Sequence, residues 1–218
     1  MRSRLFLALL ALMLISCADG KTSTSFDSLE TMQIDSLERV DIKQELGFWE
    51  VSKASPYLGG LGNNISFAYG FAMCGDTSYC QDSKWQYGGF ICTCRNLVIK
   101  RDKGIEVIKN RFELKETFAP IESRGEALSY AIIMTSNYPV FDEEYFKDEY
   151  RYFSSKPRPT AVQEFKNHYL VKLFDYKTFG CDHPYYSVLV RVDKNGDVSE
   201  YRRQAIFEDP EDDGLCRD

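Results

Sequence analysis

Ser123-Arg124-Gly125-Glu126 begins the clearest helical stretch of the sequence, which continues to Thr135. A serine followed three residues later by a glutamate has the form of a capping box, in which each side chain accepts a hydrogen bond from a backbone amide. Behind this cap, apolar residues recur at helical spacing on one face, namely Leu128, Ala131 and Ile132, with Ala127 and Met134 at its edges. A helix with one apolar face needs a sheet to cover that face.

The chain after this helix supplies such a sheet. Alternation of apolar and polar residues predicts strands over residues 161–165, 169–176, 185–192 and 198–207. Asn195-Gly196 separates the last two strands, and this dipeptide is a strong signal for a β-hairpin turn. We therefore expect an α+β fold in which one main helix packs on an antiparallel sheet.

The region before the helix, residues 47–120, is rich in cysteine, aromatic and β-branched residues and reads as mostly β. Strands are predicted for residues 65–73 and 86–93, and a hairpin joins residues 96–100 to 105–108. Asn110 followed by Glu113 predicts a short helix that reaches Phe118. Whether residues 47–120 and 121–218 form two parts or one continuous domain stays open at this point.

Residues 121–204, a helix followed by an antiparallel meander, resemble PepSY and cystatin-like domains. The resemblance is carried by the closing strand pair around Asp193-Lys194-Asn195-Gly196. It implies binding of a protein or peptide, because PepSY domains elsewhere are implicated in binding and restraining peptidases. The long loop that carries Cys181 and the cysteine-rich first half depart from the pattern. The whole chain is also similar to uncharacterised bacterial lipoproteins with an acidic tail, here residues 209–216.

The N-terminus has the layout of a secretory signal, with Arg2 and Arg4 before an apolar run over residues 5–15. This run is shorter than the ~20 residues that span a bilayer as a helix. Leu14-Ile15-Ser16-Cys17 resembles a bacterial lipobox, which implies a signal peptide over residues 1–16 and fatty acyl chains, such as palmitate, on Cys17. Residues 17–46 are then expected to form a lipidated tether. Cleavage at another position is the alternative.

Charge and compartment narrow the range of partners. The formal net charge of the full sequence is −6. Removal of the signal takes away the two arginines, so the net charge of the mature chain is more negative by two. An acidic chain without a block of lysine and arginine argues against nucleic acid and against electrostatic binding to anionic lipid. The expected membrane contact is therefore the lipid on Cys17. Ala18 after that cysteine, in place of Asp, slightly favours the outer membrane as the location in the cell envelope.

Six cysteines remain after Cys17, and in an exported chain an even number indicates disulfides. The candidates are Cys74, Cys80, Cys92, Cys94, Cys181 and Cys216. Cys92 and Cys94 lie two apart in a predicted strand, so both point to one face, and their Cα atoms are poorly placed for a mutual bridge. We expect them to reach separately toward Cys74 and Cys80, which leaves Cys181 with Cys216.

Two groups of residues carry possible chemistry. Cys92-Thr93-Cys94 presents two thiols on one strand face, which suits a soft metal or electron transfer. Cys181-Asp182-His183 contains three types of zinc ligand, and a zinc site would need a second segment, either Cys216 or Cys92 and Cys94. His168 lies in a predicted turn and is read as solvent-facing. The acidic residues 209–213 could bind calcium weakly, but a solvated acidic loop is the simpler interpretation.

No recognisable catalytic motif is present, and no cofactor or resident metal is expected. The function expected from the sequence is that of a non-catalytic cell-envelope lipoprotein that binds a protein or peptide partner. Two alternatives stay open: an envelope redox or zinc-binding enzyme that uses Cys92, Cys94, Cys181 and His183, and a purely structural lipoprotein.

Overall fold

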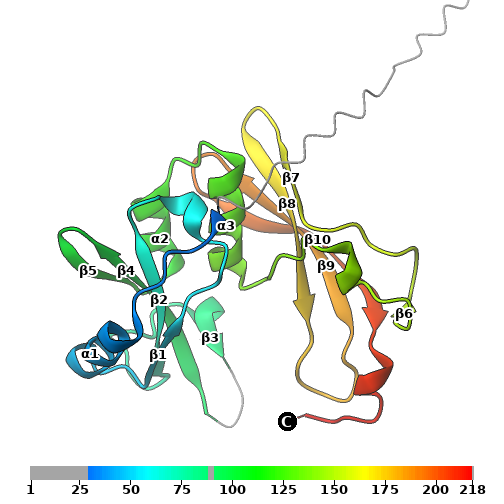
Figure 1. Ribbon diagram of the computed structural model, residues 1–218, viewed down its shortest axis with the longest axis horizontal. Helices are drawn as coiled ribbons and strands as arrows, with labels where there is room; N and C mark the ends of the chain where they lie inside the picture. The colour runs from blue at the N-terminus through cyan, green and yellow to red at the C-terminus, as the bar shows by residue number, and fades with distance from the viewer. Residues whose placement is uncertain (1–28, 88–90, 218) are drawn as a thin grey trace, which may run out of the picture.

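The computed structural model describes residues 29–87 and 91–217, which form two five-stranded antiparallel sheets with helix α3 between them (Figure 1). The signal, the lipobox and Cys17 lie outside the described residues. The helices are α1 (Ser36–Leu46), α2 (Arg111–Phe118) and α3 (Arg124–Thr135). Short 3-10 turns add η2 (Gly59–Leu61), η3 (Ser83–Trp85), η4 (Glu143–Tyr145) and η5 (Pro210–Asp212). The predicted α+β fold is confirmed.

The first sheet contains β1 (Glu50–Lys53), β2 (Ser66–Met73), β3 (Gln86–Tyr87), β4 (Thr93–Arg101) and β5 (Gly104–Ile108). Its order is β1-β2-β4-β3, and β5 shares with β3 the edge of β4 that faces away from β2. The strand predicted over residues 86–93 is therefore wrong in extent. Gln86 and Tyr87 pair with the start of β4 as a separate short strand, and β4 itself begins at Thr93.

The second sheet contains β6 (Arg151–Tyr152), β7 (Ala161–Glu164), β8 (His168–Tyr176), β9 (Tyr185–Asp193) and β10 (Val198–Glu208), in the order β6-β10-β9-β8-β7. Strands β7 to β10 lie where the sequence predicted them. The turn between β9 and β10 is closed by a hydrogen bond from the Gly196 amide to the Asp193 carbonyl, at 2.8 Å. It is thus a hairpin turn, as expected.

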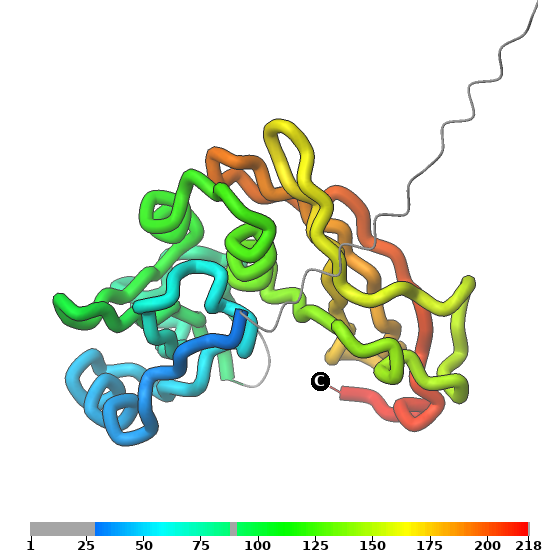
Figure 2. Tube along the Cα trace, turned by 45° about the horizontal axis from the view of Figure 1, so that its top comes forward, coloured from blue at the N-terminus to red at the C-terminus, as the bar shows by residue number. Residues whose placement is uncertain are grey.

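Helix α3 begins with the predicted capping box. The Glu126 amide donates to the Ser123 hydroxyl at 3.1 Å, and the Ser123 amide donates to the Glu126 carboxylate at 3.0 Å. All residues from Ala127 to Met134 are buried, so the helix is covered on both sides and not on one face as predicted. Both views show α3 between the two sheets (Figure 1, Figure 2).

One hydrophobic core runs through α3 from sheet to sheet. Phe67, Leu97 and Ile99 enter it from the first sheet, and Val171, Leu173, Val188 and Val190 enter it from the second. The helix and the η2 turn approach closely, because Gly60 donates its amide to the Ser129 hydroxyl at 3.2 Å and a Cβ at Gly60 would overlap the backbone of Gly125. The two halves of the chain therefore share one continuous core.

Residues 29–46, which the sequence assigned to the tether, belong to the folded body. Leu29, Ile34 and Ile42 are buried, and the Ile34 amide donates to the Phe67 carbonyl at 3.0 Å. The prediction is wrong here because these three apolar side chains lie among polar residues. Their burial depends on contacts with β2 and its surroundings, which the local sequence does not reveal. Among the described residues, no helix is long and apolar enough to span a membrane.

Aromatic residues between Phe146 and Tyr152 contribute to a separate small hydrophobic core on the second sheet. The rings of Tyr150 and Tyr185 both stack on Phe207, with centroids 4.6 and 4.5 Å away. Burial raises the pKa of the Tyr150 hydroxyl to about 12. Most of this aromatic segment is therefore used in packing, while Phe153 at its end stays exposed.

Candidate functional site

A cleft of about 530 Å³ opens where α2 and the end of α3 meet β10. Its floor and walls combine apolar and cationic groups from distant parts of the sequence. Phe112 projects from α2 with 70% of its surface exposed. The lining residues are Lys84, Arg111, Phe112, Lys115, Met134, Thr135, Asn137, Gly196, Asp197, Val198, Ser199, Glu200 and Arg203.

The outer edge of β10 borders this cleft without a strand beside it. On that side, β6 pairs only with Phe207 and Glu208. From Val198 to Ala205 no other strand of the described chain pairs with the outer edge. The side chains of residues 199–204 are all exposed. A shift of register between Glu200 and Arg202 places a bulge at Tyr201 in the middle of this edge.

Most of the cations around the cleft are held by carboxylates. Arg111 contacts Asp82 at 2.7 Å, Lys115 contacts Asp197 at 2.6 Å, and Arg203 contacts Asp175 at 2.6 Å. Lys84 differs, because no carboxylate of the described residues forms an ion pair with its ammonium group.

The Asp82 carboxyl fixes the position of α2 beside the cleft. Burial acts to raise its pKa, but hydrogen bonds from the Arg111 side chain and from the amides of Lys84 and Arg111 outweigh this effect and lower it. At neutral pH the carboxylate is charged and holds the start of α2 against η3. The pKa of the Asp197 carboxyl is also lowered, first by its hydrogen bond from Lys115.

The combination of groups suits an extended peptide. A strand edge offers backbone amides and carbonyls to another chain, and this is the basis of recognition by strand addition. Phe112 and Val198 offer apolar surface next to that edge, and Lys84 offers a positive charge that forms no ion pair within the described residues. These residues were not predicted from the sequence. One signal was present, because residues 199–204 are polar on both strand faces, as at a sheet edge.

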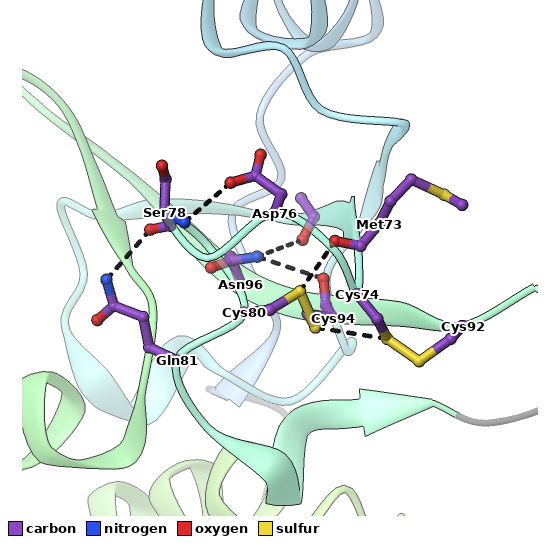
Figure 3. Close-up of a disulfide and its surroundings, with 10 residues drawn as sticks. Met73, Cys74, Asp76, Ser78, Cys80, Gln81, Cys92, Cys94 and Asn96 are labelled. Carbon is purple, nitrogen blue, oxygen red and sulfur yellow. Dashed lines mark hydrogen bonds between the residues drawn. A yellow bond between two sulfur atoms is a disulfide. The ribbon is translucent and has the colours of Figure 1, made fainter.

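The six cysteines form three disulfides, so the prediction of disulfide bonds is confirmed. The pairs are Cys74–Cys92, Cys80–Cys94 and Cys181–Cys216, the last with Cα atoms 4.1 Å apart. The first two pairs lie together at one end of the first sheet (Figure 3). The third joins the loop between β8 and β9 to the C-terminal tail.

The structure does not assemble the alternative site of Cys92, Cys94, Cys181 and His183. Within the described residues, the one group of three or more possible metal ligands is Cys74, Cys80 and Cys94. His183 is 4% exposed, and its two ring nitrogens face the carbonyl oxygens of Lys177 at 3.0 Å and Leu215 at 2.8 Å. The buried ring therefore lies between the loop and the tail and links the two.

The other candidate residues are also engaged in packing or ion pairs. His168 is the first residue of β8, is half-buried, and stacks its ring on the partly exposed Phe165, with centroids 4.7 Å apart. In the acidic tail, Asp212 accepts hydrogen bonds from Tyr176 at 3.0 Å and Arg217 at 3.2 Å. Asp213 pairs with Arg151. These arginines neutralise carboxylates that a calcium ion would need.

The comparisons with known proteins give no match. No family model, no curated protein and no solved structure matches this chain. The resemblances to PepSY domains and to bacterial lipoproteins therefore stay predictions.

Proposed function

We propose that this chain is a non-catalytic cell-envelope lipoprotein that binds an extended segment of a protein partner along the outer edge of β10. The observation that carries the proposal is the unpaired edge from Val198 to Ala205 beside a cleft of about 530 Å³. Attachment to the membrane, with the outer membrane favoured, is through acyl chains on Cys17. Several acyl chains give stable anchoring, which one chain does not.

The cleft favours a particular kind of segment. The backbone of an added strand would pair with β10, and one apolar side chain would lie against Phe112 and Val198. Lys84 lies in the same cleft and forms no ion pair with a carboxylate of the described residues, so an acidic side chain of the segment would complete the set of ion pairs around the cleft. The expected ligand is therefore an extended peptide with an apolar and an acidic residue near each other.

The test of binding uses random decapeptides displayed on phage, selected against the full mature chain. Selected peptides are synthesised with a fluorophore, and their Kd is measured by fluorescence anisotropy. We expect Lys84→Glu and Phe112→Ala each to weaken binding by roughly five- to 150-fold, because each removes one contact of about 1–3 kcal/mol. Lys103→Glu is the control, since Lys103 is exposed in the turn between β4 and β5.

Hydrogen exchange tests the mode of binding. Strand addition protects amides of residues 199–204 when the peptide is present, and leaves the exchange of β5 unchanged. Peptides that bind all three variants equally, or that leave β10 unprotected, contradict the proposal. Failure to select any peptide favours the purely structural alternative.

The lipid anchor is tested separately. Cells that express the full chain are fed an alkyne-labelled fatty acid, and the protein is examined by gel fluorescence after coupling to a dye. Label is expected on the native chain and not on Cys17→Ala. Label that persists in Cys17→Ala contradicts the assignment of the lipobox.

A further inference from the structure

Cysteine sulfur atoms gather at one end of the first sheet. Those of Cys74, Cys80 and Cys94 all lie within 4.8 Å of one another, and Cys92 is bonded to Cys74. The Cys74 and Cys94 sulfurs belong to different disulfides and are 3.8 Å apart. Figure 3 shows the two disulfides side by side, with no side chain drawn between them.

The register of the sheet brings three of these cysteines together. Met73 lies opposite Thr93, so the next residue, Cys74, faces Cys92, and its amide donates to the Cys92 carbonyl at 3.1 Å. Cys94 lies two residues beyond Cys92, and alternate residues of a strand point to the same face.

The fourth cysteine comes from an ordered turn. The Cys80 amide donates to the Asp76 carbonyl at 2.8 Å, and the Ser78 amide donates to the Asp76 carboxylate at 2.9 Å. The Cys80 sulfur lies 3.1 Å from the Met73 carbonyl oxygen. Backbone pairing and turn hydrogen bonds thus hold the segments that carry the four cysteines, and the disulfide to Cys74 places the Cys92 sulfur.

Stapling alone does not require two disulfides to touch. A tetrahedral zinc ion with Zn–S bonds of about 2.3 Å places its ligand sulfurs about 3.8 Å apart. The distance between the Cys74 and Cys94 sulfurs has this value. We propose that Cys74, Cys80, Cys92 and Cys94, when reduced, form a tetrathiolate site for zinc, and that the two disulfides are the closed state of this site.

The chemistry is that of two ordinary steps. Two molecules of an external dithiol reduce the Cys74–Cys92 and Cys80–Cys94 bonds, so that each protein disulfide gains two electrons and two protons and each dithiol becomes a disulfide. Zinc then displaces the four thiol protons as it binds. Cys74, Cys80 and Cys92 are half-buried, so solvent reaches the cluster, whereas Cys94 is buried.

This site is independent of the proposed peptide cleft, because none of the four cysteines lines that cleft. It also differs from the zinc set considered from sequence, since Cys181 and His183 belong to the C-terminal loop. The third disulfide, Cys181–Cys216, provides an internal control, as its reduction yields only two thiols.

The experiment uses the full mature chain with Cys17→Ala, reduced with a phosphine and titrated with Co²⁺ as a spectroscopic substitute for zinc. We expect one Co²⁺ per chain, with the intense visible bands and the sulfur-to-metal charge-transfer band of a tetrahedral thiolate site, and loss of both when zinc is added. The oxidised chain should give no such spectrum.

Variants assign the ligands. Cys181→Ser with Cys216→Ser should keep the full spectrum, whereas Cys80→Ser or Cys94→Ser should reduce the charge-transfer intensity and weaken binding by at least tenfold. Near-UV circular dichroism follows folding in each sample. The proposal is overturned if the reduced native chain gives no tetrahedral spectrum, if the Cys181 and Cys216 variant loses it, or if the Cys80 and Cys94 variants keep it unchanged.

Discussion

The Arg95 guanidinium donates a hydrogen bond to the carbonyl oxygen of Ile133 at 2.7 Å, and so joins β4 to the last turn of α3. Arg95 is 5% exposed, and its guanidinium lies over the rings of Tyr69 at 4.8 Å and Trp85 at 5.4 Å. A cation near the C-terminal end of a helix also interacts favourably with the helix dipole. The contact ties the first sheet to the helix that the second sheet covers.

We expect Arg95→Ala to lower the free energy of unfolding by about 2–4 kcal/mol, because it leaves a cavity and an unpaired carbonyl in the core. Arg95→Lys should be intermediate, since it keeps a charge but loses the planar group that stacks on the rings. Urea denaturation followed by tryptophan fluorescence measures both. Stability within 0.5 kcal/mol of the native chain for Arg95→Ala, on the order expected for surface substitutions, would show that this contact is dispensable.

The close approach of η2 to α3 at Gly60 predicts a steric effect of any added side chain. Gly60→Ala should destabilise the fold by about 1–3 kcal/mol or more, because the added Cβ overlaps the Gly125 backbone and separates η2 from α3. Gly75→Ala is the matched control, as nothing lies within 4 Å of a Cβ there. Thermal unfolding should show a lower Tm for the first variant alone. Equal Tm values would mean that the loop moves away from α3 without cost.

The lowered pKa of Asp82 predicts a loss of stability in acid. The unfolded carboxyl, with a pKa of about 3.9, binds a proton before the folded one does. The contribution of Asp82 is therefore complete above the unfolded pKa and is lost as the pH falls through the lower folded pKa. Denaturant unfolding of the native chain and of Asp82→Asn from about pH 6 to about pH 2.5 should give curves that converge in acid. Curves that stay parallel would exclude Asp82 as the source.

We expect the His183 side chain to anchor the C-terminal tail. His183→Ala removes the buried imidazole that lies between the Lys177 and Leu215 carbonyl oxygens, and we expect a loss of about 1–3 kcal/mol and faster hydrogen exchange over residues 209–217. The Cys181–Cys216 bond should keep the tail attached, so the effect stays local. His168→Ala is the control, and it should leave exchange in the tail unchanged. An unaltered tail in His183→Ala would assign the anchoring to the disulfide alone.

Sequence alone predicted the features that depend on local signals. The capping box at Ser123 and Glu126 and the alternation in β8, β9 and β10 are written in neighbouring residues, and these elements were located closely. Sequence did not predict that the second face of α3 is also buried. Ser129 and Tyr130 are polar or amphipathic, and their burial depends on partners far along the chain. The Ser129 hydroxyl donates a hydrogen bond to the Tyr57 carbonyl at 2.7 Å, and the Tyr130 hydroxyl donates one to the Gly196 carbonyl at 3.0 Å.

The cleft was unpredictable for a related reason. Lys84, Phe112 and Arg203 come from three separate elements and meet only after α2 docks beside β10. No local pattern distinguishes such residues from ordinary surface residues. The cysteine pairing was within reach, since strand spacing restricts which sulfurs face each other, but the approach of the two disulfides depends on the turn at Asp76.

The position of α3 has a consequence for the order in which the chain folds. The strands of the first sheet are complete at Ile108, yet the core they share with α3 needs residues up to Thr135. A chain that emerges from its N-terminus, from a ribosome or through a membrane pore, therefore exposes Phe67, Leu97 and Ile99 until the helix has followed. Truncation before Thr135 should leave an aggregation-prone fragment and not a small independent domain.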